Sequence, residues 1–319
     1  MKLLKNILFV AGTSDDDTAV LERAIAIAGN NQATLTVVSI VRKVAKHVAF
    51  GGHNANDLQD TIIEQRRLEL LEQVADCQHS GLDVNVKILV GRGFIEVIRE
   101  VLLHSHDVVI KAAEESQFSM NIFGSMDQSL LRNCPCPVWI VKSTENQGDK
   151  EVVVALDYDP EDPAVDAFNG QMLKLASSMA LAEFAELHIV HAWHLQNELL
   201  LRSNRVGLSA EEVDGYVQNE KEERSRWLDE LVAKYLTVQD LEVESYLRPT
   251  LHLCKGNASS VVPQLIKNLG AELVVMGTVG RTGIPGFIIG NTAETILNQI
   301  ECSVLAVKPD GFVTPVTLP

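Results

Sequence analysis

The stretch Leu273-Val-Val-Met-Gly277-Thr-Val-Gly280-Arg-Thr-Gly-Ile-Pro-Gly-Phe-Ile-Ile-Gly290-Asn-Thr292 contains the features that decide the fold. It opens with a short apolar run, typical of a buried strand, and a helical pattern begins after Gly290. Glycines in the loop let backbone amides approach a bound anion closely, and the first turn of the helix offers N–H groups at its positive dipole end. The stretch therefore predicts a strand, a phosphate-binding loop and a helix, in that order.

The same pattern occurs in the first half of the 319-residue chain, at a constant offset of 166 positions. Three segments align: Asp107-Val-Val-Ile-Lys111 with Leu273–Gly277, Phe123-Gly-Ser125 with Ile289-Gly-Asn291, and Cys136–Lys142 with Cys302–Lys308. An internal duplication explains the match, and the length suits two domains of about 150 residues. We expect domains at residues 1–145 and 150–319, with their boundary in the polar segment Ser143–Asp149.

Apolar runs alternate with helical patterns in both halves, which predicts α/β architecture with two tandem, doubly wound, parallel five-stranded sheets of Rossmann-like type. Ligands of such sheets bind at the carboxyl ends of the strands. The strands are expected at Ile7–Val10, Thr34–Val38, Val84–Val90, Val108–Ile110 and Val138–Val141, then Val152–Ala155, Leu187–Val190, Leu251–Cys254, Leu273–Met276 and Val304–Val307. The helices are expected near 17–29, 57–77, 95–103 and 126–132, then 164–180, 210–235, 259–269 and 292–299.

Composition excludes several classes of function. Lys and Arg number 27 against 43 Asp and Glu, a formal charge of −16, so the average field repels nucleic acid and anionic membrane surfaces. The sequence lacks both a run of apolar residues long enough to span a bilayer and a signal-peptide cleavage site. Five scattered cysteines do not suggest a disulfide framework, and the one-residue spacing of Cys134 and Cys136 differs from redox and zinc motifs. We expect a soluble cytoplasmic protein.

The spacing Gly277-x2-Gly280-x9-Gly290, followed by a small polar residue and a helix, resembles the nucleotide-binding signature of the universal stress protein family, in its tandem form. The resemblance implies the adenine nucleotide alpha hydrolase-like fold and ATP or a related adenine nucleotide as ligand. It implies that Asp157, after the first strand of the second half, contacts the nucleoside. The three glycines and the residue after the last one would contact phosphates. Asn291 stands where the family usually has Ser or Thr, so the hydroxyl role passes to Thr292 or is lost.

The resemblance also implies what the protein does. It implies a role in survival under stress, including resistance to DNA-damaging agents, with at most slow ATP hydrolysis instead of ordinary enzyme activity. It further implies self-association through the terminal strands. Val138–Val141 and Val304–Val307 are therefore expected at sheet edges, where each can pair with its counterpart from the other repeat.

The first half departs from the signature. Lys111 replaces Gly277, Glu114 replaces Gly280 and Gly12 replaces Asp157, although Gly124-Ser125 keeps the final element. A carboxylate at Glu114 would repel a phosphate, so this half is expected to have lost standard ATP binding. Lys111 is expected to serve another anionic ligand or to be a solvated loop lysine.

Two other classes of function stay open. Asp157-Tyr-Asp159 resembles the paired aspartates of phosphatases that form an aspartyl-phosphate, but Gly277-Thr-Val-Gly280 supplies none of the further groups such a mechanism needs. A dimeric scaffold that needs no ligand, or binds an apolar one, is the second. No metal site is expected: His188, His191 and His194 share a three-residue spacing, yet His188 and His191 would point to opposite faces of a strand.

Overall fold

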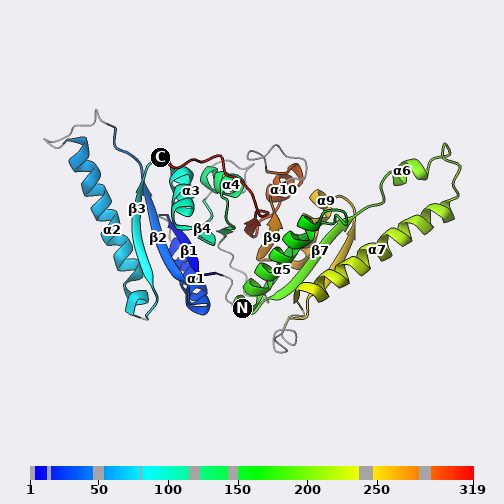
Figure 1. Cartoon of the computed structure of the whole chain (residues 1–319), viewed down its shortest axis with the longest axis horizontal. Helices are drawn as coiled ribbons and strands as arrows, with labels where there is room; N and C mark the ends of the chain where they lie inside the picture. The colour runs from blue at the N-terminus through cyan, green and yellow to red at the C-terminus, as the bar shows by residue number, and fades with distance from the viewer. Residues whose placement is uncertain are drawn as a thin grey trace. The chain divides into compact units, whose positions relative to one another are not determined.

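The computed structural model describes residues 4–12, 16–45, 54–79, 81–114, 123–142, 150–236, 247–279 and 289–319. The predicted segment Ser143–Asp149 lies outside these ranges. Strands and helices alternate along the chain as the sequence predicts (Figure 1). Among the described helices, none combines the length and the apolar character needed to cross a bilayer.

The chain divides into two compact units. The first comprises residues 1–145, 278–289 and 303–319, and the second comprises residues 146–277 and 290–302. The repeats of the sequence and the compact units therefore differ in one respect, because the end of the second repeat belongs to the first unit. The first repeat contributes β1 (Asn6–Ala11), α1 (Asp16–Asn31), β2 (Thr34–Val41), α2 (Ala55–His79), β3 (Val84–Val90), α3 (Gly93–His104), β4 (Val108–Ala112), α4 (Ser125–Asn133) and β5 (Val138–Val141).

The second repeat follows the same order, with one additional short helix. Its elements are β6 (Glu151–Leu156), α5 (Pro163–Glu183), β7 (Glu186–Trp193), α6 (Glu198–Leu201), α7 (Ala210–Leu236), β8 (Thr250–Lys255), α9 (Ala258–Leu269), β9 (Leu273–Gly277), α10 (Asn291–Leu297) and β10 (Ser303–Val307). Strands run in the order β3-β2-β1-β4-β5-β10 in the first unit and β9-β6-β7-β8 in the second. The described pairings are parallel apart from that of β5 with β10.

The doubly wound topology follows from the sequence pattern. Val, Ile and Leu fill the central strands, whose residues are buried on both faces, as a parallel sheet covered by helices requires. Right-handed crossovers place α5 and α7 on one face of the second sheet and α9 on the other. Consistent with this, α5 packs against α7, and α9 packs against α10. The predicted α/β fold class is confirmed.

The terminal strands of the two repeats pair with each other inside one chain. β10 runs antiparallel to β5, with Leu305 opposite Trp139, and Ser303 Oγ accepts a hydrogen bond from the backbone N–H of Lys142 at 3.0 Å. The predicted pairing of Val138–Val141 with Val304–Val307 is confirmed. Both edges of β5 are thereby occupied, by β4 and β10. The prediction that Val138–Val141 lies at a sheet edge is therefore wrong, since β5 lies between β4 and β10. Self-association of two chains through the terminal strands stays a prediction.

A buried lysine anchors the end of β10. Lys308 has only 4% of its surface exposed, and its Nζ donates hydrogen bonds to the carbonyl oxygen of Leu131, at 2.7 Å, and to Thr278 Oγ1. Burial lowers the pKa of Lys308 to about 8. The charged form of this lysine is therefore disfavoured in the folded protein.

Stability should depend on pH through this lysine. Between pH 8 and 10 the unfolded chain keeps its proton on Lys308 more readily than the folded chain does, so stability should rise with pH. Relative to Lys308→Met, the wild-type free energy of unfolding is expected to gain about 2 kcal/mol over this interval, and to show no such change below it. Denaturant titrations at each pH measure this, with the exposed Lys267→Met as control. The prediction is contradicted if the free energy of unfolding changes with pH in the same way for wild type and Lys308→Met.

Candidate functional site

Two of the predicted site residues, Asp157 and Gly277, lie at the carboxyl edge of the second sheet. Asp157 directly follows β6, and Gly277 ends the neighbouring parallel strand β9, one position beyond the Ala155–Met276 pair. Gly290 precedes α10 as its N-cap, and Asn291 and Thr292, both exposed, open that helix. Gly280 lies outside the described residues. Carboxyl strand ends and a helix N-terminus thus belong to one unit, as a phosphate site of this fold requires.

Asn169 holds the loop that carries Asp157. Its Nδ2 donates to the backbone carbonyl of Asp157 at 2.7 Å, and its Oδ1 accepts from the backbone N–H of the same residue at 3.3 Å. Only 1% of Asn169 is exposed, on the covered face of α5. The Asp157 side chain itself is exposed beyond β6. Sequence reasoning missed Asn169, although an amide among the apolar residues of a helix is a signal for such a clamp.

An aromatic cluster stands beside Asp157. The Tyr158 ring meets the Trp227 ring of α7 edge-on, with 5.0 Å between the ring centroids. The guanidinium carbon of Arg224 lies over the face of the Tyr158 ring, 3.6 Å from its centroid. Trp227 also meets His191 of β7 edge-on at 4.8 Å. Burial, and then a hydrogen bond from the Tyr158 hydroxyl to Glu223, raise the pKa of Tyr158. The phenol stays neutral at physiological pH, and the cluster fixes the loop next to Asp157.

The structure gives different physical explanations for a glycine at position 277 and at position 290. At Gly277, a Cβ atom would lie 2.7 Å from the ring of Phe168 on α5, so packing alone requires a glycine there. Gly290 has φ −62° and ψ 139°, a conformation open to any residue. Backbone geometry therefore does not explain Gly290. A phosphate in front of α10 does need a position without a side chain there.

In the first unit, Lys111 stands at the position equivalent to Gly277, and its side chain forms a buried ion pair. Lys111 Nζ lies 2.9 Å from Asp127 Oδ1 of α4 and donates to the carbonyl oxygen of Ala112 at 2.8 Å. Only 6% of Lys111 and none of Asp127 is exposed. Both expectations for Lys111 were wrong, because the lysine is neither solvated nor available to an anionic ligand: its charge is neutralised inside the fold.

A carboxylate occupies the N-terminus of α4. Glu114 Oε2 accepts a hydrogen bond from the backbone N–H of Met126 at 3.2 Å, and the backbone N–H of Glu114 donates to Asp127 Oδ2 at 2.8 Å. Glu114 takes the position that a phosphate oxygen would take at a helix N-terminus. At the same offset of 166, the second repeat has Gly280 in place of Glu114 and Ala293 in place of Asp127. The second repeat therefore carries no carboxylate that could replace a ligand at these two positions.

The first unit also closes the position equivalent to Asp157. Gly12 stands there, and the Arg66 guanidinium of α2 donates to its carbonyl oxygen and, through Nε, to Ser39 Oγ at 2.9 Å. Together with Lys111, Glu114 and Asp127, this arginine fills the carboxyl edge of the first sheet with the protein's own charges. The predicted difference between the halves thus has a structural basis.

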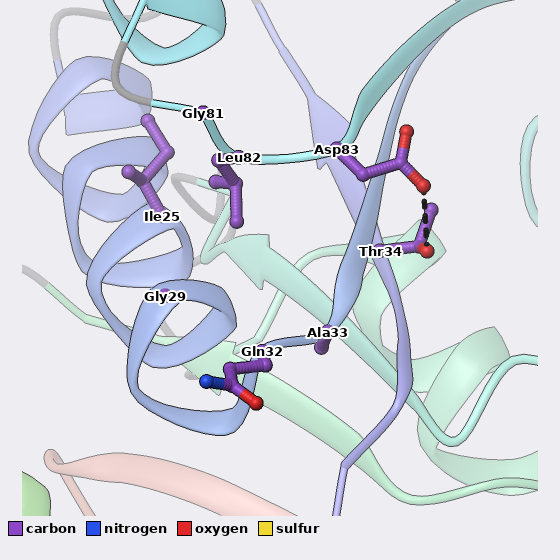
Figure 2. Close-up of a pocket in the computed structure, with 8 residues that line it drawn as sticks. All are labelled: Ile25, Gly29, Gln32, Ala33, Thr34, Gly81, Leu82 and Asp83. Atoms are coloured by element: carbon purple, nitrogen blue, oxygen red, sulfur yellow. Dashed lines mark hydrogen bonds between the residues drawn. The ribbon is translucent and has the colours of Figure 1, made fainter.

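A pocket of about 490 Å³ lies at the other edge of the first sheet, where β2 and β3 begin (Figure 2). Among the described residues of its lining, Asp83 alone is ionisable, and its carboxylate accepts a hydrogen bond from Thr34 Oγ1 at 2.9 Å. Ligands of doubly wound sheets bind at the opposite, carboxyl ends of the strands. We therefore do not assign this pocket to the nucleotide site. Its lining consists of Ile25, Gly29, Gln32, Ala33, Thr34, Gly81, Leu82 and Asp83.

Comparisons with known proteins agree with this architecture. The Universal stress protein family matches twice, at residues 4–142 and 150–308. The chain is 30% identical to universal stress protein E of Escherichia coli K12, over 100% of this chain and 98% of that protein. It is 26% identical to the protein of the same name from Photorhabdus laumondii, over 98% and 97%. A solved universal stress protein from Archaeoglobus fulgidus, 16% identical, matches with a TM-score of 0.64 over 95% of this chain and 98% of its own.

Proposed function

Because the chain belongs to the universal stress protein family and carries its domain twice, we propose that the second unit binds ATP or a related adenine nucleotide and that the first unit does not. The observation that carries the proposal is the contrast between α4 and α10. Glu114 occupies the N-terminus of α4, whereas the equivalent position before α10 is Gly280. The positive N-terminus of α4 is thus neutralised by Glu114, whereas α10 has no carboxylate at the equivalent position.

The second unit would bind the nucleoside through a side chain and the phosphates mainly through backbone groups. Asp157, held by Asn169, would accept hydrogen bonds from the nucleoside hydroxyls. The phosphates would lie against Gly277, Gly280 and Gly290, and against the first amides of α10. Charge-assisted hydrogen bonds of this kind contribute about 1.5–3 kcal/mol each. Asn291 or the hydroxyl of Thr292 would complete the phosphate contacts.

The proposed activity is binding, with at most slow hydrolysis. Thr278, the hydroxyl nearest to Gly277 in the chain, is fully buried and hydrogen-bonded to Lys308. It is therefore not available as a nucleophile. The aspartyl-phosphate alternative would need Asp157 to attack, with Asp159 as the acid and base.

We extend the proposal to the cell on the strength of the family resemblance. The protein would act in the cytoplasm and support survival under stress, including exposure to DNA-damaging agents. The test compares the survival of a deletion strain after such exposure when it carries a chromosomal copy of the wild-type gene, of the Gly290→Asp variant, or neither. If the wild-type and variant copies restore survival equally, the cellular role does not depend on nucleotide binding.

Asp157→Asn should weaken ATP binding because it removes the charge that accepts from the nucleoside. The expected loss is about 10-fold to 150-fold, the equivalent of one charge-assisted hydrogen bond. Calorimetry on full-length, nucleotide-stripped protein measures it, with Asp159→Asn as the matched control that should bind like the parent. A magnesium-dependent phosphatase activity that both variants lose would instead favour the aspartyl-phosphate alternative. Unchanged binding in Asp157→Asn would contradict the assigned role.

A further inference from the structure

Four ionisable side chains meet at the amino edge of the second sheet. Glu151 begins β6 and lies directly across from Glu186, which begins β7. His188 is two residues further along β7, and His252 of β8 is in register with Val190, two residues beyond His188. Side chains two residues apart on a strand share a face. All four residues therefore project from the same face of the sheet, opposite to the face on which His191 meets α7.

Three of these side chains point ligand atoms at one another. One carboxylate oxygen each of Glu151 and Glu186 and one ring nitrogen of His188 all lie within 4.8 Å of one another. His188 Nε2 is 2.5 Å from Glu151 Oε2. The side chains of His188 and Glu151 are only 6% and 17% exposed, so water screens their interaction weakly. Glu186 is exposed and leaves one side of the cluster open.

His252 fixes the orientation of the His188 ring. Its Nε2 lies 2.9 Å from His188 Nδ1, so one nitrogen of His188 is engaged by β8 and the other faces the carboxylates. Histidines that bind metals usually have this arrangement, with the nitrogen that does not bind the metal held by a neighbouring group.

The two carboxylates of the cluster have no lysine or arginine as a partner among the described residues. Like charges directly opposite on adjacent strands are unfavourable. The first unit offers a comparison in Glu100, His104 and His106, where Lys87 Nζ lies 2.8 and 2.9 Å from the two oxygens of Glu100. A cation already occupies that cluster, and the cluster of the second unit lacks its equivalent.

We propose that Glu151, Glu186 and His188 bind one divalent transition-metal ion, with His252 as the positioning residue. One imidazole and two carboxylates suit Zn²⁺, whose bonds to nitrogen and oxygen are about 2.0–2.2 Å long, and the exposed side leaves room for water as a fourth ligand. Asp157 lies at the other end of β6, about 20 Å away at the rise of a strand, so this site is separate from the nucleotide site.

The test uses full-length protein stripped of metal with a chelator and titrated with Zn²⁺ and with Co²⁺. We expect one equivalent of either ion, and a Co²⁺ spectrum without thiolate charge-transfer bands, since the ligands are nitrogen and oxygen. His252→Phe should lower the affinity about 10-fold to 100-fold by releasing the His188 ring, and His188→Gln should lower it at least as much. Glu186→Gln, at an exposed position, should also weaken binding.

Two variants serve as matched controls. His194→Gln changes an exposed histidine just beyond β7, and His104→Gln changes the cluster already neutralised by Lys87; both should bind Zn²⁺ like the parent. Circular dichroism checks the fold of every variant. The proposal is overturned if the protein takes up no Zn²⁺. It is also overturned if Glu186→Gln and His188→Gln bind as the parent does, or if the Co²⁺ spectrum shows thiolate ligands.

Discussion

Gly290→Asp is expected to abolish nucleotide binding while leaving α10 at least as stable as before. Two negative charges about 4 Å apart repel by about 4 kcal/mol at an effective dielectric constant of 20, which corresponds to a loss of several hundredfold in affinity. The backbone of Gly290, at φ −62°, accepts any residue, and aspartate is among the preferred N-cap residues. The change therefore separates the ligand role of this position from its structural role.

ATP titration by calorimetry, together with the melting temperature, measures both effects. Gly124→Asp would be the equivalent change in the first unit, but its Cβ would lie 2.3 Å from Glu114 Oε2 and disturb the packing there. Ser125→Asp, on the exposed first residue of α4, is the better control and should leave ATP binding unchanged. If folded Gly290→Asp binds ATP as tightly as the parent, the loop is only a structural connection and the scaffold interpretation is preferred.

Asp127→Asn should destabilise the first unit by about 3 kcal/mol, because it removes the buried counter-charge 2.9 Å from the Lys111 ammonium and leaves only Glu114, at 3.8 Å. The amide keeps an acceptor for the backbone N–H of Glu114, so the change mainly removes charge. Adding Lys111→Met should restore most of the loss, since an apolar side chain needs no partner.

Hydrogen exchange of the backbone amides in β4 and α4 reports this unit separately from the other. Glu69→Gln is the matched control, because it breaks the Arg66–Glu69 pair of the same unit, whose glutamate side chain is 44% exposed. Exposed pairs contribute about 0–1 kcal/mol, so protection should change little. If Asp127→Asn and Glu69→Gln have equal effects, the buried pair does not hold the first unit together.

Local sequence patterns were sufficient to predict most of the fold. Runs of three to seven residues marked all ten described strands, with differences confined to their ends. Helix α6, Glu198–Leu201, was not predicted, because a segment of four residues is too short to show helical periodicity. The repeat could not show that β10 completes the first unit, because a duplicated pattern assigns each strand to its own copy. Which sheet a strand joins depends on edges that meet only in three dimensions.

The site was predictable where a contiguous motif carries it and not elsewhere. Gly290 and Asp157 belong to a recognisable spacing, but Asn169 and Phe168 act by contact and have no motif. The cluster of Glu151, Glu186 and His188 has no sequence motif either, because its residues come from different strands. His188 is 37 residues from Glu151 and 64 from His252, and only the register of neighbouring strands brings them together.

The placement of β10 also has a consequence for synthesis on the ribosome. The first sheet cannot be completed when residue 145 emerges, because its last strand is encoded more than 150 residues downstream. At about 5–20 residues per second, β5 waits roughly 8–30 s with one edge unpaired. That edge presents the apolar segment Val138-Trp-Ile-Val141, and unpaired edges of this kind invite association with other nascent chains. Translation speed through the second repeat therefore sets how long the nascent chain is exposed to this hazard.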